Sequence, residues 1–187
     1  ANYDQLVNLF PEFKDVSVDE LVSMINKTEC ALIRTEADEL TYPLHIMVRY
    51  EIEKEIAKGN VDYDKLPEVW ADKYEEYLGV RPTNYKEGVL QDMHWSTGYL
   101  GYFPTYALGS AYAAQLYATM EKQFDVEEAL LTNHFEKITD WLKENVHHYA
   151  ASKSMAEIVE EVSGEPFNPD YYTDYLIKKY KKLYNLD

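Results

Sequence analysis

The chain has 187 residues, of which 46% are hydrophobic, enough to build the core of one compact domain. Its 18 basic and 34 acidic residues give a net charge of -16, which opposes binding to nucleic acid or anionic lipid. The lone Cys30 excludes an internal disulfide, and neither a membrane-spanning run nor an export signal is recognisable. We therefore expect one cytoplasmic domain over residues 1–187, with Ala1 consistent with a residue left by cloning.

Capping residues and apolar spacing predict helices along most of the chain. Ser17 and Glu20 form the capping-box pattern that opens a helix over 18–27. A longer helix should run over 36–58 and end at Gly59. Its core-facing stripe recurs at every fourth residue and consists of Leu40, Leu44, Val48, Ile52 and Ile56.

The other side of this long helix is polar. Asp38, Tyr42, His45 and Arg49 follow a three- and four-residue spacing, so they share one face. Such a stack either forms a salt-bridged surface or lines a cleft, and the spacing leaves both alternatives open.

Proline and glycine mark the ends of the later helices. Pro67 opens a helix that Gly79 ends, and Pro104 opens one that reaches about residue 122. Small residues at 109–114 would let a neighbouring backbone approach, so we expect this last helix to be central and buried. No strand pair is evident, and the predicted class is all-α. The remaining predicted helices cover 126–132, 135–149, 154–163 and a final stretch from Asn168-Pro169 to about 184.

Two segments contain clustered polar groups that are unfavourable in a buried core helix: residues 33–38 and residues 88–106. In the second, His94 is either a proton donor whose tautomer Asp92 fixes, or a buried histidine satisfied by a neighbour. Tyr106 is either a hydrogen-bond donor to an oxyanion or a core tyrosine.

Arg34, in the first segment, has the planar fork that binds carboxylates. The alternative is an ion pair with Glu36, Asp38 or Glu39. The adjacent His147-His148 pair diverges by about 100° on a helix, so we expect surface histidines rather than metal ligands. No His-Glu-x-x-His motif or other complete catalytic apparatus is recognisable.

These motifs resemble one family. IRTEAD at 33–38 is similar to the Ile-Arg-x-x-Ala-Asp motif of the carboxypeptidase Taq metallocarboxypeptidases, and GVLQDMHW at 88–95 is similar to their Gly-x-x-Gln-Asp-x-His-Trp motif. The flanking sequence agrees as far as the closing SGEPFNPDYYTDYL. The family's His-Pro-Phe, Asp-x-Arg-x-Thr, His-Glu-x-x-His and His-Glu-Ser-Gln motifs would lie upstream of Asn2. The resemblance thus implies the C-terminal portion of a helical, gluzincin-type metallocarboxypeptidase.

The implied reaction is removal of the C-terminal residue of a peptide by a metal-activated water. Zinc or cobalt, its two histidine and one glutamate ligands, and the general base would belong to the absent portion, with no metal or cofactor bound by this chain. Among its own residues, the resemblance gives catalytic roles to Tyr106, His94 and Tyr99, substrate binding to Arg34, Tyr102 and Gln91, and supporting roles to Asp38 and Asp92. Arg34 would bind the free carboxylate of the peptide, and Asp92 would anchor the His94 ring.

The expected function is therefore the substrate-side part of a carboxypeptidase, inactive without the missing N-terminal portion. Two alternatives stay open: a non-catalytic helical module that binds peptides or proteins, and one half of a split enzyme. A helix surface that would meet the missing portion should be exposed, so we expect either self-association into a homo-oligomer or an open groove beside Arg34 and His94, and no uniformly charged surface there.

Overall fold

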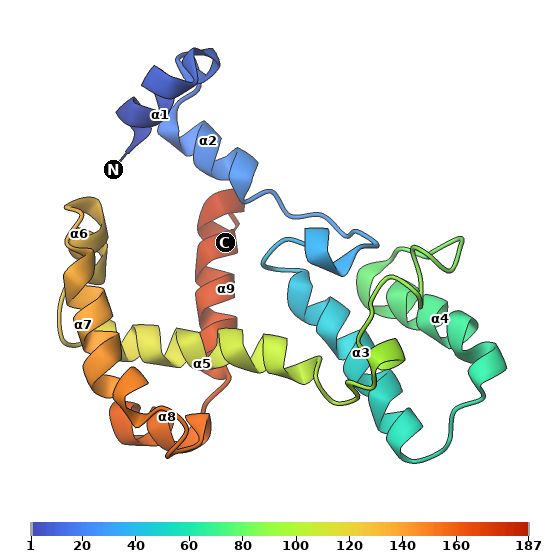
Figure 1. Ribbon diagram of the computed structural model, residues 1–187. Helices are drawn as coiled ribbons and strands as arrows, with labels where there is room; N and C mark the ends of the chain where they lie inside the picture. Colours follow the sequence, from blue (N-terminus) through green and yellow to red (C-terminus); the bar gives the residue numbers. More distant parts are fainter. Residues whose placement is uncertain (1, 187) are drawn as a thin grey trace. The chain divides into compact units, whose positions relative to one another are not determined.

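The computed structural model describes residues 2–186 and is helical throughout, without a strand in that range (Figure 1). The all-α prediction is confirmed. Ala1, with the expectation attached to it, lies outside the described residues. The α-helices are α1 (Tyr3–Leu9), α2 (Val18–Ile25), α3 (Tyr42–Ala57), α4 (Leu66–Leu78), α5 (Pro104–Glu121), α6 (Val126–Leu131), α7 (Phe135–Asn145), α8 (Met155–Ser163) and α9 (Asp170–Tyr184), and the 3-10 turns are η1 (Pro11–Phe13), η2 (Arg34–Glu36), η3 (Tyr63–Lys65), η4 (Trp95–Thr97) and η5 (His147–Tyr149).

The chain divides into two compact units. One comprises Ala1–Leu21 and Gly109–Asp187, and the other comprises Val22–Leu108. The boundaries fall within α2 and α5, so each of these helices belongs partly to both units. That the units act as one domain over 1–187 stays a prediction.

The unit over 22–108 is built on α3 packed against α4. The predicted stripe of α3 provides Val48 and Ile52, which are at most 2% exposed and pack against Trp70, Tyr74 and Leu78 of α4. Leu44 and Ile56 pack at the margin of this cluster, whereas Leu40 precedes the helix and is exposed.

The start of α3 was predicted six residues too early, at 36, because the chain before Tyr42 forms a capping loop. Asp38 accepts hydrogen bonds from the backbone N–H groups of Leu40 and Thr41 at 2.9 and 3.0 Å and from the Thr41 hydroxyl at 2.9 Å. A carboxylate that binds these donors favours a turn over a continuing helix. Pro43 then lies in the first helical turn, where its missing N–H costs nothing.

The other unit has its own apolar cluster, formed by Leu116, Met120, Val126, Trp141 and Val159. These residues come from α5, α6, α7 and α8, and the helix boundaries agree with those predicted except in α7. There the helix ends at residue 145, and the segment to 149 closes as the separate turn η5.

Two further features differ from what the sequence predicts, and one agrees. The helix α5 is not buried throughout, because Gly109 and Ala113 of its small-residue stretch are exposed while Ala111 is buried. The short helix α1 was not predicted. The predicted capping box is confirmed, since Ser17 and Glu20 exchange backbone and side-chain hydrogen bonds.

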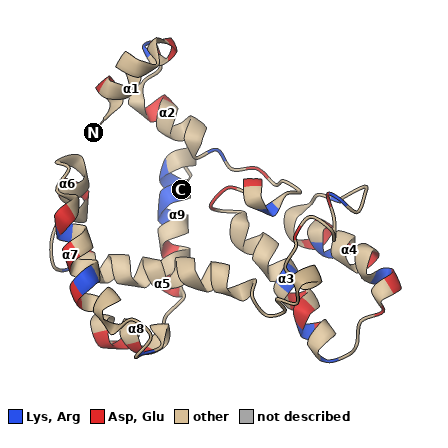
Figure 2. Ribbon diagram, in the orientation of Figure 1, with Lys and Arg blue, Asp and Glu red and all other residues tan. Residues whose placement is uncertain are grey.

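Acidic residues predominate on several helices, and α2, α6 and α8 carry no Lys or Arg (Figure 2). The end of α9 is an exception, because Lys181 and Lys182 lie in its last turn. Their positive charges are attracted by the partial negative charge of the helix C-terminus. Within residues 2–186, no helix is both long enough and apolar enough to cross a bilayer.

Ala150 has a φ of +46° and a ψ of -122°, a conformation that glycine adopts more readily than a residue with a side chain. We expect Ala150→Gly to raise the free energy of unfolding by about 1 kcal/mol, since it removes this strain. Urea denaturation measures the change. The neighbouring Ala151 lacks a positive φ, so Ala151→Gly should be neutral or destabilising; equal effects of the two changes would contradict the interpretation.

Candidate active-site cluster

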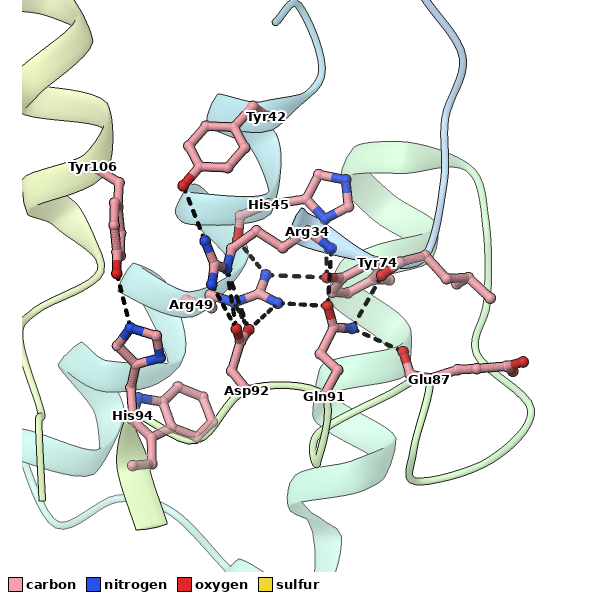
Figure 3. A network of polar contacts seen from close by, with 12 residues as sticks. Arg34, Tyr42, His45, Arg49, Tyr74, Glu87, Gln91, Asp92, His94 and Tyr106 are labelled. Carbon is pink, nitrogen blue, oxygen red and sulfur yellow. Dashed lines mark hydrogen bonds and ion pairs between the residues drawn. The ribbon is translucent and has the colours of Figure 1, made fainter. Parts of the chain in front are cut away.

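An acidic side chain between two arginines forms the centre of the site (Figure 3). Arg34 donates to Oδ1 of Asp92 from Nε at 3.1 Å and from Nη2 at 2.8 Å. Arg49, on α3, donates from Nε to Oδ2 of the same carboxylate at 2.7 Å. Arg34 is 7% exposed and Arg49 is fully buried, so these charges are largely removed from water. The paired carboxylate is what makes this burial tolerable.

The pKa of Asp92 reflects this setting. Burial alone would raise it, but the hydrogen bonds and positive charges of Arg34 and Arg49 prevail and hold it below the usual value. Asp92 is therefore a carboxylate at neutral pH. The two arginines and the one carboxylate together have a net charge of about +1, although the whole chain has a net charge of -16.

Gln91 connects the two arginines to the backbone around them. Its Oε1 accepts the backbone N–H of Arg34 and the Nη2 hydrogen of Arg49, each at 3.0 Å. Its amide nitrogen donates to the carbonyl groups of Leu32 and Glu87 at 3.0 and 2.8 Å. Both atoms of the amide are thus engaged within the chain, which favours an orienting role over direct contact with a ligand.

A neutral histidine lies next to the arginines. His45 has no exposed surface, and its Nδ1 is 3.0 Å from the Tyr74 hydroxyl, which also accepts a hydrogen bond from Arg49. Burial, reinforced by the charges of Arg49 and Arg34, lowers the pKa of His45 to about 4. On the polar side of α3, His45 and Arg49 are buried and Tyr42 is half-buried. Arg49 forms an ion pair with Asp92, so this side is salt-bridged, but inside the protein and not at its surface.

His94 and Tyr106 form a second pair beside the arginines. His94 Nε2 is 3.0 Å from the Tyr106 hydroxyl, and the Tyr106 ring centroid lies 5.1 Å from the Arg34 guanidinium carbon. The buried Phe103 packs against the His94 ring, with 4.3 Å between the centroids. Asp92 makes its hydrogen bonds to the arginines and not to His94, whose buried Nδ1 has no hydrogen-bond partner among residues 2–186. The expectation that Asp92 anchors this ring was wrong.

The other predicted residues surround this centre at different depths. Tyr102 lies against both members of the pair, with its ring centroid 5.7 Å from His94 and 5.5 Å from Tyr106. Tyr99 is 60% exposed and contacts Tyr102, so it lies at the rim. Asp38 lies apart, where it accepts hydrogen bonds from Thr28 and from the start of α3.

Four residues of the cluster were missing from the predicted site: Arg49, His45, Tyr42 and Tyr74. The shared polar face of α3 was the available signal for the first three. Tyr74 follows the apolar stripe of α4, and nothing in its spacing marks it as part of a polar cluster.

In the part of the chain that the structure describes, no three His, Cys, Asp or Glu side chains are grouped so that they could hold a metal ion. His147 and His148 are exposed in η5, as predicted. The residues present thus do not form a metal site, and no catalytic step through a metal follows from them.

We expect Asp92→Asn to lower the free energy of unfolding by about 3–5 kcal/mol, because it leaves two buried guanidinium groups without a counter-charge. Asp72→Asn is the matched control, since Asp72 pairs with Arg81 on the surface and its side chain is 62% exposed. Denaturant unfolding at pH 7 measures both variants. A loss for Asp92→Asn no larger than that for Asp72→Asn would contradict this account.

The low pKa of His45 predicts a stability that depends on pH. Between its value of about 4 in the fold and the ordinary value of about 6.5, the unfolded chain binds the extra proton, so stability falls as the pH falls. We expect a loss of about 2 kcal/mol from this residue between pH 7 and pH 5. Comparing unfolding of the wild type and His45→Gln at both pH values isolates this contribution. Equal pH dependence of the two proteins would refute it.

Comparison with known proteins finds related sequences and similar folds. The chain is 48% identical over 176 residues to carboxypeptidase 1 of Bacillus subtilis, and 41% identical over 177 residues to thermostable carboxypeptidase 1 of Thermus thermophilus. Each match covers 94% of this chain but 35% of the relative. The chain thus spans about a third of the length of these proteins and corresponds to their C-terminal part.

The crystal structure of the M32 carboxypeptidase from Deinococcus radiodurans has the same fold, with a TM-score of 0.95 and 34% identity over 99% of this chain and 38% of that one. The sequence profile of the carboxypeptidase Taq (M32) metallopeptidases matches residues 1–180. A match of this extent, together with the shared fold, shows that the chain belongs to the carboxypeptidase Taq (M32) metallopeptidase family.

Proposed function

We propose that this chain is the substrate-side part of a metal-dependent carboxypeptidase, which releases C-terminal amino acids from peptides. Arg34 binds the free carboxylate of the peptide, and His94 and Tyr106 act at the neighbouring carbonyl. The metal, zinc or cobalt, and the general base belong to a portion outside this chain. The chain by itself is then inactive.

The observation that carries the proposal is the unbalanced positive charge beside a tyrosine-histidine pair. One hydrogen on each of Nε, Nη1 and Nη2 of Arg34 is directed to Asp92 or Tyr42, which leaves a second hydrogen on each terminal nitrogen. A carboxylate is the ligand that matches such an edge in charge and geometry. An exopeptidase must recognise this group immediately next to the bond that it cleaves.

The pair supports a role at the scissile carbonyl. When His94 carries its proton on Nε2, it donates to the Tyr106 oxygen and holds this phenol beside the Arg34 guanidinium. A phenol held in this way stabilises the negative charge that develops on a carbonyl oxygen during hydrolysis. Gln91 and Asp92 contribute by holding Arg34, and Tyr102 and Tyr99 contribute aromatic surface for the peptide.

The surface near His94 is not uniformly charged. Leu90 and Met93 are 68% and 73% exposed, and Leu100 is 54% exposed. Apolar side chains exposed to this extent, in a chain about a third as long as its relatives, support a missing portion that covers them. This favours part of an enzyme over a stand-alone binding module.

The carboxylate assignment is tested with the chain extended upstream by the portion that its relatives possess. We expect cleavage of a peptide with a free C-terminus, little cleavage of the same peptide amidated, and a loss of about 100-fold in kcat/KM for Arg34→Met, equivalent to a charge-assisted hydrogen-bonded pair of about 3 kcal/mol. Arg81→Met, which removes a surface arginine, is the control. Full activity of a folded Arg34→Met enzyme would exclude Arg34 from carboxylate binding.

The expected inactivity of the chain alone has its own test. Elemental analysis of the purified chain should find no stoichiometric zinc or cobalt, and peptidase assays should show no release of C-terminal residues. Adding the upstream portion as a separate polypeptide distinguishes a split enzyme, for which activity should return. One tightly bound zinc per chain, accompanied by cleavage, would refute the proposed division of labour.

A further inference from the structure

A buried acidic residue outside the arginine cluster holds the loop that connects His94 to the tyrosines. Glu53, on α3, is 6% exposed. Its Oε1 accepts the indole N–H of Trp95 at 2.9 Å and the backbone N–H of Gly101 at 3.0 Å. These donors lie at the two ends of the segment 95–101, so one carboxylate oxygen fixes both ends against α3.

We propose that Glu53 is a positioning residue, which holds the segment 95–101 so that His94 and the tyrosines after it keep their relative places. The expected effect of Glu53 on catalysis rests on the proposed function. The hydrogen bonds by which Glu53 holds the loop do not depend on that function.

The second half of the loop is largely exposed. Tyr99 and Leu100 are 60% and 54% exposed, and Gly98 and Gly101 have positive φ angles of +85° and +80°. The first half is closed locally, because Thr97 and Tyr99 donate backbone hydrogen bonds to the His94 carbonyl. A segment with so little apolar burial depends on specific hydrogen bonds for its order.

The two residues that Glu53 holds, Trp95 and Gly101, are next in sequence to residues of the site. Trp95 directly follows His94 and packs edge-on against Phe103, with 6.1 Å between the ring centroids. Gly101 directly precedes Tyr102, and Phe103 in turn packs on the His94 ring. Movement of either fixed point would therefore change the separation between the His94 ring and the rings of Tyr102 and Tyr106.

The chemistry of the carboxylate suggests a discriminating pair of substitutions. Oε2 of Glu53 is buried and has no hydrogen-bond partner among the described residues, so both loop contacts use the other oxygen. Glutamine offers an amide oxygen that accepts two hydrogen bonds, so Glu53→Gln should keep the hold. Glu53→Met fills a similar volume and offers no such acceptor, so it should release the loop.

Hydrogen exchange in the isolated chain, followed by NMR, tests the hold without any need for activity. We expect Glu53→Met to speed exchange of the Gly101 amide and the Trp95 indole N–H at least tenfold, and Glu53→Gln to change both less than threefold. Glu55→Met, an exposed acidic position on the same helix, is the control and should change neither. If Glu53→Met does not fold, a scalar coupling across the hydrogen bond from the Gly101 nitrogen to the Glu53 carboxyl carbon in the wild type decides instead. Unchanged exchange in a folded Glu53→Met chain, or no such coupling, would overturn the proposal.

Kinetics of the chain extended by the upstream portion test the consequence. We expect Glu53→Met to lower kcat at least tenfold and to change KM less than threefold, because the hydrogen bonds that hold Arg34 are to Gln91, Asp92 and Tyr42. Glu53→Gln should restore kcat. Equal losses in both variants would overturn hydrogen-bond acceptance as the role of Glu53. An inactive wild-type extended protein would refute the proposed function, while the exchange result would still decide whether Glu53 holds the loop.

Discussion

The arrangement of the residues around the site depends on the two arginines, Arg34 and Arg49, that share the Asp92 carboxylate. Arg34 comes from η2, Arg49 from the middle of α3, and Asp92 from the loop before η4, so the cluster joins three segments that are remote in the sequence. Two guanidinium groups taken from water are costly unless a carboxylate and further hydrogen-bond acceptors lie next to them. Tyr42 accepts a hydrogen bond from Arg34, and Gln91 and Tyr74 accept from Arg49, so the positions of these side chains follow from that requirement.

The same constraint separates the roles of neighbouring residues. Because Asp92 is engaged by the arginines, it cannot also orient the His94 ring. His94 instead relies on Tyr106 for a hydrogen bond and on Phe103 for packing. The site thus has a rigid charged base and an aromatic wall, and the two come together where Arg34 meets the Tyr106 ring.

Much of this could be predicted from the sequence, for reasons that are local. Ser17, Pro67 and Gly79 mark helix ends because caps and φ angles depend on nearby residues, and the stripe containing Val48 and Ile52 follows from helical periodicity. The motif residues of the site were found through family resemblance. The partner of Arg34 was not found, because the alternatives considered lay within five residues and Asp92 is 58 positions away. Nothing local shows that Arg49 and His45 are buried, or that Glu53 meets Trp95 and Gly101.

The hydrogen bonds of Gln91 require a neutral amide at this position. A glutamate of the same shape could accept the hydrogens from Arg34 and Arg49, but it would neutralise the surplus cation and oppose the carbonyl groups of Leu32 and Glu87. The amide gives the arginines an acceptor without adding negative charge. Neutrality at this one position therefore preserves the surplus positive charge of the cluster, and replacing the single amide nitrogen by an oxygen, with no change of shape, would be enough to cancel it.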